Sequence, residues 1–138
     1  MSYRYIYPPI PLDDLKPSRS SATRDLSNYS LGGGGSVSIG KSGLDGWSAL
    51  VVVVRVTYDA NATAGIRVRW LYSPDGTNYD SPEEADAQGN YYDPTFTAGG
   101  TIQTTLLVPI FTPYVRIYIT NKDSTYSHVL NVWTLTMR

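Results

Sequence analysis

The amino-acid sequence predicts an all-β protein: an antiparallel β-sandwich or jelly roll of about seven to eight strands, preceded by an extended N-terminal arm. The composition favours strands joined by tight turns, because 12 tyrosines and 3 tryptophans occur together with 12 glycines and 9 prolines. Short runs of alternating apolar and polar residues recur at intervals of roughly ten to fifteen residues. No window of about twelve residues keeps the period of an amphipathic helix.

Residues 1–31 are predicted to form the arm. They contain many large apolar side chains, but prolines such as Pro8, Pro9 and Pro11 prevent a regular helix. A solvated tail would be poor in aromatic and aliphatic residues, so the arm should contact an apolar surface. The residues predicted to make this assembly interface are Tyr3, Tyr5, Ile6, Tyr7, Ile10, Leu12 and Leu15.

The arm could fold back over its own sandwich and cover a sheet edge, or it could cross to a neighbouring subunit. The second interpretation is favoured, because proline-rich extended segments bind with little loss of entropy and can add to exposed strands. Residues 32–46 are predicted to form a glycine-rich hinge, Gly32 to Gly35, and a first short strand near Ser36. The hinge would let the arm leave the sandwich in any direction.

The sandwich domain is predicted to span residues 47–138. Residues 47–58 (WSALVVVVRVTY) are apolar on both faces up to Val54, which predicts a central strand covered on each side. Residues 66–72 (IRVRWLY) follow a turn and alternate, with Arg67 and Arg69 outward. These two strands are expected to form a hairpin.

Residues 73–90 contain Pro, Gly, Asp and Asn without an alternating run, which predicts a long exposed connection that begins with a Pro-Asp-Gly turn. A short strand should follow within residues 91–98, and Pro94 would place it at a sheet edge. The last three strands are predicted within residues 101–111, 113–121 and 128–137. In the second of these, Val115, Ile117 and Ile119 should face the core.

The charge and the cysteine content limit the classes of partner and site. The formal charge is −1, from 11 basic and 12 acidic residues, which argues against nucleic acid and anionic membranes as partners. The sequence has no cysteine, so disulfides and thiolate metal sites are excluded. No apolar run approaches the length of a membrane span, and the prolines near Arg4 are unlike a signal peptide. We therefore expect a protein made in the cytoplasm.

No catalytic residue, metal or cofactor is predicted. The single histidine, His128, begins the last predicted strand and is expected at the surface or at a sheet edge. A group of acidic residues offers oxygen ligands of the kind that calcium prefers, but their spacing is not that of an EF-hand, and a solvated turn is favoured. These residues are Asp75, Asp80, Glu83, Glu84, Asp86 and Asp93.

The aromatic residues divide into two groups. Most of the three tryptophans of the sequence (Trp47, Trp70 and Trp133) fall on positions predicted to face the core. The candidates for surface contact lie near turns and are Tyr91, Tyr92 and Tyr126. Flat amphipathic rings suit both sugars and protein interfaces.

Two stretches, WLYSPDGTNYDS and PYVRIYITNKDSTYSHVLNVWTL, resemble small β-sandwich structural proteins of tailed bacteriophages. In those proteins a strand ends in a Ser-x-Asp-Gly turn, and a later P-Y-V-R-I-x-I-x-N strand pairs with a final V-N-V-W strand. The resemblance covers residues 47–138, includes no catalytic residue, and implies a sandwich fold and a role in the virion. The arm is similar in style to the extensions of head-decoration and capsid-cementing proteins.

We therefore expect a non-enzymatic virion structural protein: a capsid decoration or cementing subunit, or another assembly subunit, that forms a homo-oligomer. Its partners would be copies of itself and a major capsid or other virion protein. Two alternatives remain open. One is a carbohydrate- or surface-binding β-sandwich module that uses the aromatics and the acidic loop. The other is the subunit of an extracellular filament assembled by strand exchange.

Overall fold

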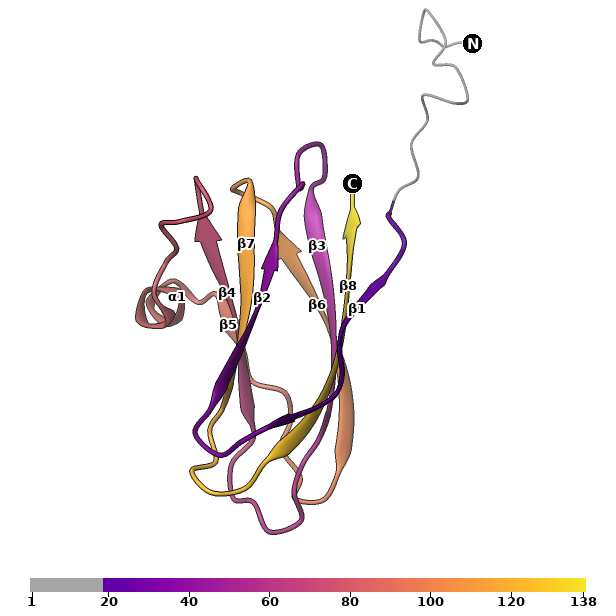
Figure 1. Ribbon diagram of the computed structural model, residues 1–138, viewed down its shortest axis with the longest axis vertical. Coiled ribbons are helices and arrows are strands. Elements are labelled where there is room, and N and C mark those ends of the chain that lie inside the picture. Colours follow the sequence, from indigo (N-terminus) through magenta and orange to yellow (C-terminus); the bar gives the residue numbers. More distant parts are fainter. Residues whose placement is uncertain (1–18) are drawn as a thin grey trace, which may run out of the picture.

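The computed structural model describes residues 19–138, which form two four-stranded antiparallel sheets packed face to face (Figure 1). The first sheet has the strand order β1 (Thr23–Leu31), β8 (His128–Met137), β3 (Ala49–Thr57) and β6 (Thr101–Pro109). The second sheet has the order β2 (Ser36–Lys41), β7 (Tyr114–Asn121), β4 (Ile66–Ser73) and β5 (Tyr91–Tyr92). One short helix, α1 (Pro82–Gln88), precedes β5. The predicted all-β sandwich is confirmed.

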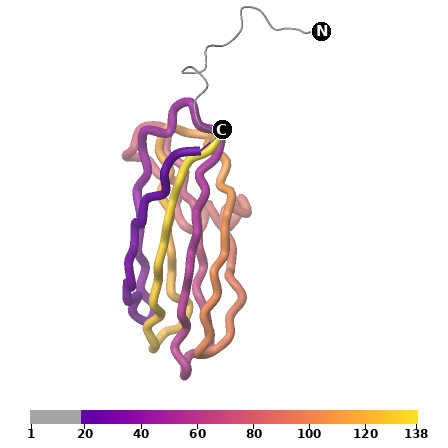
Figure 2. The backbone as a smooth tube through the Cα atoms, turned by 90° about the vertical axis from the view of Figure 1, so that its right-hand side faces the viewer, coloured from indigo at the N-terminus to yellow at the C-terminus, as the bar shows by residue number. Residues whose placement is uncertain are grey.

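The strands pair from the two ends of the chain inward. β1 pairs with β8, β2 with β7, β3 with β6 and β4 with β5. A ribbon of such pairs that folds over into two sheets is a jelly roll. The first and last strands, indigo and yellow, consequently run side by side along the whole sandwich (Figure 2).

The expected hairpin of residues 47–58 and 66–72 is wrong. β3 pairs with β6 and β8 in the first sheet, whereas β4 pairs with β5 and β7 in the second. The segment between β3 and β4 therefore crosses from one sheet to the other. Alternation in β4 correctly identified its buried face, but it carries no information about which strand lies beside it.

The predicted end of the arm at residue 31 is also wrong, because residues 23–31 belong to the sandwich. Leu31 is buried in the core and Leu26 packs against it. The β1 ladder shifts register on both sides of Leu26, and Asn28 has a positive φ of 48°. These irregularities interrupt the two-residue period and explain why the strand was missed.

The glycine run is a tight turn between β1 and β2, and the predicted free hinge is wrong. Gly34 donates its backbone N–H to the Asp123 carbonyl at 2.7 Å. A Cβ on Gly33 would lie 2.7 Å from the backbone of Thr125, so only glycine fits there. The predicted short strand near Ser36 is confirmed as β2, and the sandwich therefore begins well before residue 47.

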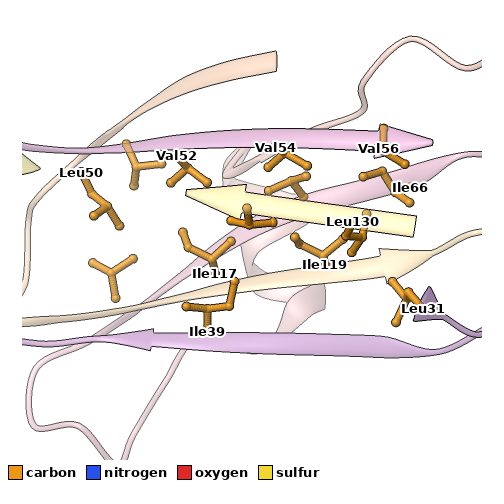
Figure 3. Close-up of a cluster of buried hydrophobic side chains, with 14 of the residues drawn as sticks. Leu31, Ile39, Leu50, Val52, Val54, Val56, Ile66, Ile117, Ile119 and Leu130 are labelled. Carbon is orange, nitrogen blue, oxygen red and sulfur yellow. The ribbon is translucent and has the colours of Figure 1, made fainter. Parts of the chain in front are cut away.

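The core lies between the two sheets and consists mainly of branched aliphatic side chains (Figure 3). Val115, Ile117 and Ile119 of β7 are fully buried, as predicted. On β3, Leu50, Val52, Val54 and Val56 face inward and are also buried. Each fully buried side chain of this size stabilises the fold by about 1.5–3 kcal/mol.

The connection between β4 and β5 contains helix α1 where only an exposed loop was predicted. Ser81 and Glu84 form a reciprocal capping box, Pro82 occupies the first turn, and Gly89 ends the helix in the left-handed conformation. The motif Ser-Pro-Glu-Glu in the sequence is the signal that could have revealed it. The predicted edge position of β5, which Pro94 follows, is confirmed.

Candidate interaction surface

Four of the six acidic residues that offered calcium ligands, Asp75, Glu84, Asp86 and Asp93, have other partners. Among residues 19–138 no three His, Asp or Glu side chains converge on a point that could hold a metal ion. The Asp75 carboxylate closes the turn after β4 by accepting the backbone N–H groups of Thr77 and Asn78. These hydrogen bonds, that of Asn78 first, lower the pKa of Asp75 to about 2.

Two further carboxylates attach helix α1 and strand β5 to β4. Asp86 of α1 binds Arg69 at 2.7 Å, and Asp93 after β5 binds Arg67 at 2.8 Å. Hydrogen bonds from these arginines are the main reason that the pKa of each carboxyl is lowered. The Arg67 guanidinium also lies 4.1 Å from the ring centre of Tyr91, which favours a cation–π contact. This network has a structural role.

The predicted surface position of His128 is wrong, because its side chain is fully buried. Its Nδ1 accepts the backbone N–H of Asp59 at 3.2 Å, and its Nε2 lies 2.9 Å from the Ala64 carbonyl oxygen. We therefore assign the proton to Nε2, which donates to that carbonyl. The ring also meets the Tyr58 ring edge to face at 5.0 Å. His128 thus closes the connection between β3 and β4.

Asp123 organises the opposite side of the same connection. Its carboxylate accepts backbone N–H groups from Thr63, Thr125 and Tyr126. These bonds, that of Tyr126 first, hold the pKa of Asp123 well below its ordinary value. The carboxylate therefore ties the turn between β7 and β8 to the segment between β3 and β4.

The outer face of the first sheet is apolar over one half of its length. Val51 lies directly opposite Leu107 of β6 and Leu135 of β8, and the next row places Val53 opposite Trp133. Towards the other end the rows become polar, with Arg55 opposite Asn131. We call the first group, completed by Met137, the apolar half-face. Its residues are Val51, Val53, Leu107, Trp133, Leu135 and Met137.

No described element lies over the apolar half-face (Figure 2). Helix α1 contacts β4 of the second sheet, on the other side of the molecule. Leu107 is 63% exposed, whereas the valines and the tryptophan are half-buried by their neighbours in the sheet. The outer face of an antiparallel sheet normally carries polar residues, so this half-face is a candidate interaction surface.

A groove of about 300 Å³ lies at the end of the sandwich next to the apolar half-face. Its lining includes Trp47 and Phe111, and Phe111 is 76% exposed. The Arg138 guanidinium stacks 4.5 Å from the ring centre of Trp47. The described chain also begins here, because Arg19 forms a β-bridge with Met137. The half-face, the groove and the start of the described chain therefore share one end of the molecule.

The sequence-predicted site residues are distributed as follows. The seven arm residues, Tyr3 to Leu15, lie outside the described residues. Tyr91 and Tyr92 form the edge strand β5, and Tyr126 lies between β7 and β8; all three are exposed. The tyrosines therefore belong to two separate segments, strand β5 and the connection between β7 and β8.

The sequence pattern does not predict the apolar half-face, because it predicts covered positions for three of its residues. Val51 and Val53 are predicted to face a second layer and Trp133 to face inward, whereas Trp133 lies on the outer face with Arg24 5.2 Å from its ring centre. The sequence signal for this surface is the run of residues 47–54, which is apolar on both faces of the strand. The run forms a surface because no layer from the described part of the chain, residues 19–138, covers it.

No protein-family model and no curated protein sequence matches this chain. Among residues 19–138, no helix has the length and apolar character needed to cross a membrane. The fold and the surface described above are therefore the basis for the functional assignment. They define an all-β sandwich with an apolar half-face that no element of residues 19–138 covers.

Proposed function

We propose that the protein is a non-enzymatic structural subunit that assembles with copies of itself, its N-terminal arm contacting neighbouring subunits. The observation that carries the proposal is the apolar half-face. Contiguous exposed apolar surface on a small protein usually marks an interaction site, since water contact with it is unfavourable. Removing the half-face from water therefore requires a partner whose own contact surface is apolar.

The arm has the chemistry of such a partner. Among residues 1–15, three tyrosines, two isoleucines and two leucines are the side chains predicted to contact an apolar surface. The described chain begins at the same end as the half-face, so arms and half-faces would meet where copies adjoin. Repeated over a symmetric assembly, even a weak contact of this kind would hold subunits firmly.

The most specific form of the proposal is a capsid decoration or cementing subunit located in a virion. The resemblance of residues 47–138 to bacteriophage sandwich proteins supports it, and the jelly-roll strand order is one that viral capsid domains use. This support is analogy at the level of the fold. A partner in the capsid shell would be a protein, in keeping with a net charge of −1.

The arm is tested by placing a charge among its apolar side chains in the full chain. We expect Ile6→Asp or Ile10→Asp to abolish association through the arm, measured by sedimentation velocity as the loss of the larger assemblies, while the midpoint of thermal unfolding stays unchanged. Ser2→Asp is the matched control, because it adds the same charge at a polar position. Equal losses of association and stability would show that the arm is part of its own domain.

A carbohydrate-binding module is the second candidate, favoured by the exposed rings of Tyr91 and Tyr92 and by the use of jelly rolls in lectins. Such a module would remain monomeric and would bind glycans, with Tyr92→Ala abolishing the binding. A filament subunit, the third candidate, would polymerise alone into fibres visible by electron microscopy. The three proposals therefore give different results in the same set of measurements.

A further inference from the structure

Strand β6 forms one edge of the first sheet, and its outer side is unpaired within residues 19–138. On its inner side it pairs with β3 from Thr101↔Thr57 to Pro109↔Ala49 without a register shift. Its sequence, TIQTTLLVP, contains no charged residue, and its only proline is the last residue. A long, regular and uncharged edge of this kind is a template for adding another strand.

The other three sheet edges are protected. β1 is bulged, β5 has only two residues, and β2 has six residues and ends at Lys41, which is bound to Asp25 of β1. Bulges, short strands and charges are the usual means of preventing edge-to-edge pairing. β6 therefore differs from every other edge of the described sandwich.

The hydrogen bonds at both ends of β6 show which of its backbone groups are free. Tyr58 N–H donates to the Gly100 carbonyl at 2.9 Å, and Ile110 N–H donates to the Ser48 carbonyl at 2.9 Å. Hydrogen-bonded and non-hydrogen-bonded pairs alternate along an antiparallel ladder, so the even-numbered residues of β6 are bonded to β3. The backbone groups directed away from the sheet belong to Thr101, Gln103, Thr105 and Leu107.

We propose that β6 pairs antiparallel with β6 of a second copy, about a twofold axis that passes beside Thr105. Thr105 then faces Thr105 of the other copy, and Gln103 faces Leu107. These are the residues with free backbone groups, so each facing pair exchanges its backbone hydrogen bonds. The inference rests on the proposed function, since it names a surface through which copies of the subunit associate.

A second copy fits this edge for two reasons. A twofold interface must be complementary to itself, and β6 is uncharged along its full length, so no like charges meet. Leu107, which is 63% exposed, gains the aliphatic part of Gln103 as a neighbour. The chain's own residues 1–18, which precede Arg19, are the competing occupant that the mixing test below distinguishes from a second copy.

The pairing joins the two first sheets into one continuous sheet. Because the axis is perpendicular to that sheet, the outer faces of both copies lie on the same side. The two apolar half-faces therefore become parts of one larger surface for further subunits. β6 pairing and arm binding are separate contacts. An extended assembly needs at least two such contacts on each subunit.

The test uses opposite charges at Thr105 in the full chain, with association followed by sedimentation velocity. Thr105→Lys alone and Thr105→Glu alone each place like charges face to face, and we expect the dimer dissociation constant to rise at least roughly tenfold. An equimolar mixture of the two variants should restore dimers, because Lys then faces Glu. Thr105 is exposed, so the unfolding midpoint of each variant should stay near that of the wild type.

The matched control is Ser38→Lys and Ser38→Glu on β2, an exposed position on another edge strand, which should leave dimerisation unchanged. A wild-type chain that stays monomeric, or a dimer indifferent to the charge at Thr105, would overturn the proposal. The proposal would also be overturned if the mixture of the two variants failed to restore the dimers that each variant alone had lost. The occupant of the edge would then be another segment, such as residues 1–18.

The two proposals can fail separately. If Ile6→Asp leaves association intact while the charge pattern at Thr105 holds, the arm has no part in assembly and the β6 pairing stands. If the charge pattern fails while Ile6→Asp still prevents association, the arm contact stands and the β6 pairing is rejected.

Discussion

His128 shows how a polar side chain can be necessary inside an apolar core. The ring satisfies one backbone donor, Asp59 N–H, and one backbone acceptor, the Ala64 carbonyl, at a connection that has no sheet ladder of its own. A buried backbone group without a partner is costly, so the imidazole stabilises the crossing between the sheets by satisfying two of them.

We expect His128→Leu to lower the free energy of unfolding by about 2–3 kcal/mol, because both backbone groups lose their partner while the volume is nearly kept. Chemical denaturation followed by tryptophan fluorescence measures the loss. Val115→Ala truncates a core side chain without removing a hydrogen bond. Its loss in free energy of unfolding is a reference for the size of the His128→Leu effect. A His128→Leu variant as stable as the wild type would mean that water replaces the imidazole.

Asp123 makes the fold sensitive to acid. Its pKa is lowered in the folded protein by the N–H groups it accepts, so the unfolded chain binds a proton more readily. The stabilisation is fully present above the ordinary aspartate pKa of about 3.9 and is lost as the pH falls towards the folded value. Asp75, Asp86 and Asp93 act in the same direction.

We therefore expect the denaturation midpoint of the wild type to fall steeply below about pH 4. Asp123→Asn should be less stable at neutral pH, and its midpoint should depend less on pH in the acid range. Denaturant titrations at a series of pH values measure both effects. Asp45→Asn, at an exposed position, is the control and should keep the wild-type profile.

At the scale of elements, β1 decides where the folded domain begins. It covers the free edge of β8 and inserts Leu31 into the core. Its residues lie in the same N-terminal third as the arm, yet they have a different physical role. A truncation that removes both cannot report on the arm alone.

We expect deletion of residues 1–18 to leave the cooperative unfolding transition intact, whereas deletion of residues 1–31 should abolish it. The longer deletion removes a whole strand, and truncating a single buried leucine already costs about 2–5 kcal/mol of a typical stability of about 5–15 kcal/mol. Circular dichroism during heating distinguishes the two. A folded protein lacking residues 1–31 would show that β1 is dispensable.

For the whole molecule, the jelly-roll order makes nearly every strand contact a long-range one. Thr23 near the start of the sandwich pairs with Thr134 near the end of the chain, and β2 pairs with β7. The entropy of closing such long loops must be overcome before the pairings become favourable.

We expect refolding from denaturant to take milliseconds to seconds or longer, as in other all-β sandwiches. Stopped-flow fluorescence of the three tryptophans follows it. Folding within microseconds would mean that local contacts, which are few in this topology, control the rate.

Local patterns predicted much of the fold. The alternation in β7 placed Val115, Ile117 and Ile119 in the core, and Pro94 placed β5 at an edge. Helix α1 was missed because it is shorter than the window in which a helical period can be recognised, although its capping box was visible. β1 was missed because its bulges break the alternation.

The candidate site was only partly predictable. The sequence showed that Val51 and Val53 are apolar on the outer face of their strand, but a covered strand and an exposed half-face have the same pattern. The seven arm residues remain predictions, since they lie outside the described residues. The free side of β6 could not be predicted, because a strand's own residues do not say whether it has one neighbour or two.

By itself, the sequence determined the β class and the buried side of most strands, because side-chain alternation and turn residues act over a few neighbouring positions. Only the tertiary structure decided that β3 and β4 lie in different sheets, that His128 is buried, and that no element of residues 19–138 covers the outer side of β6 or the apolar half-face. These features depend on contacts between residues distant in the chain, and such contacts are selected by the packing of the whole sandwich.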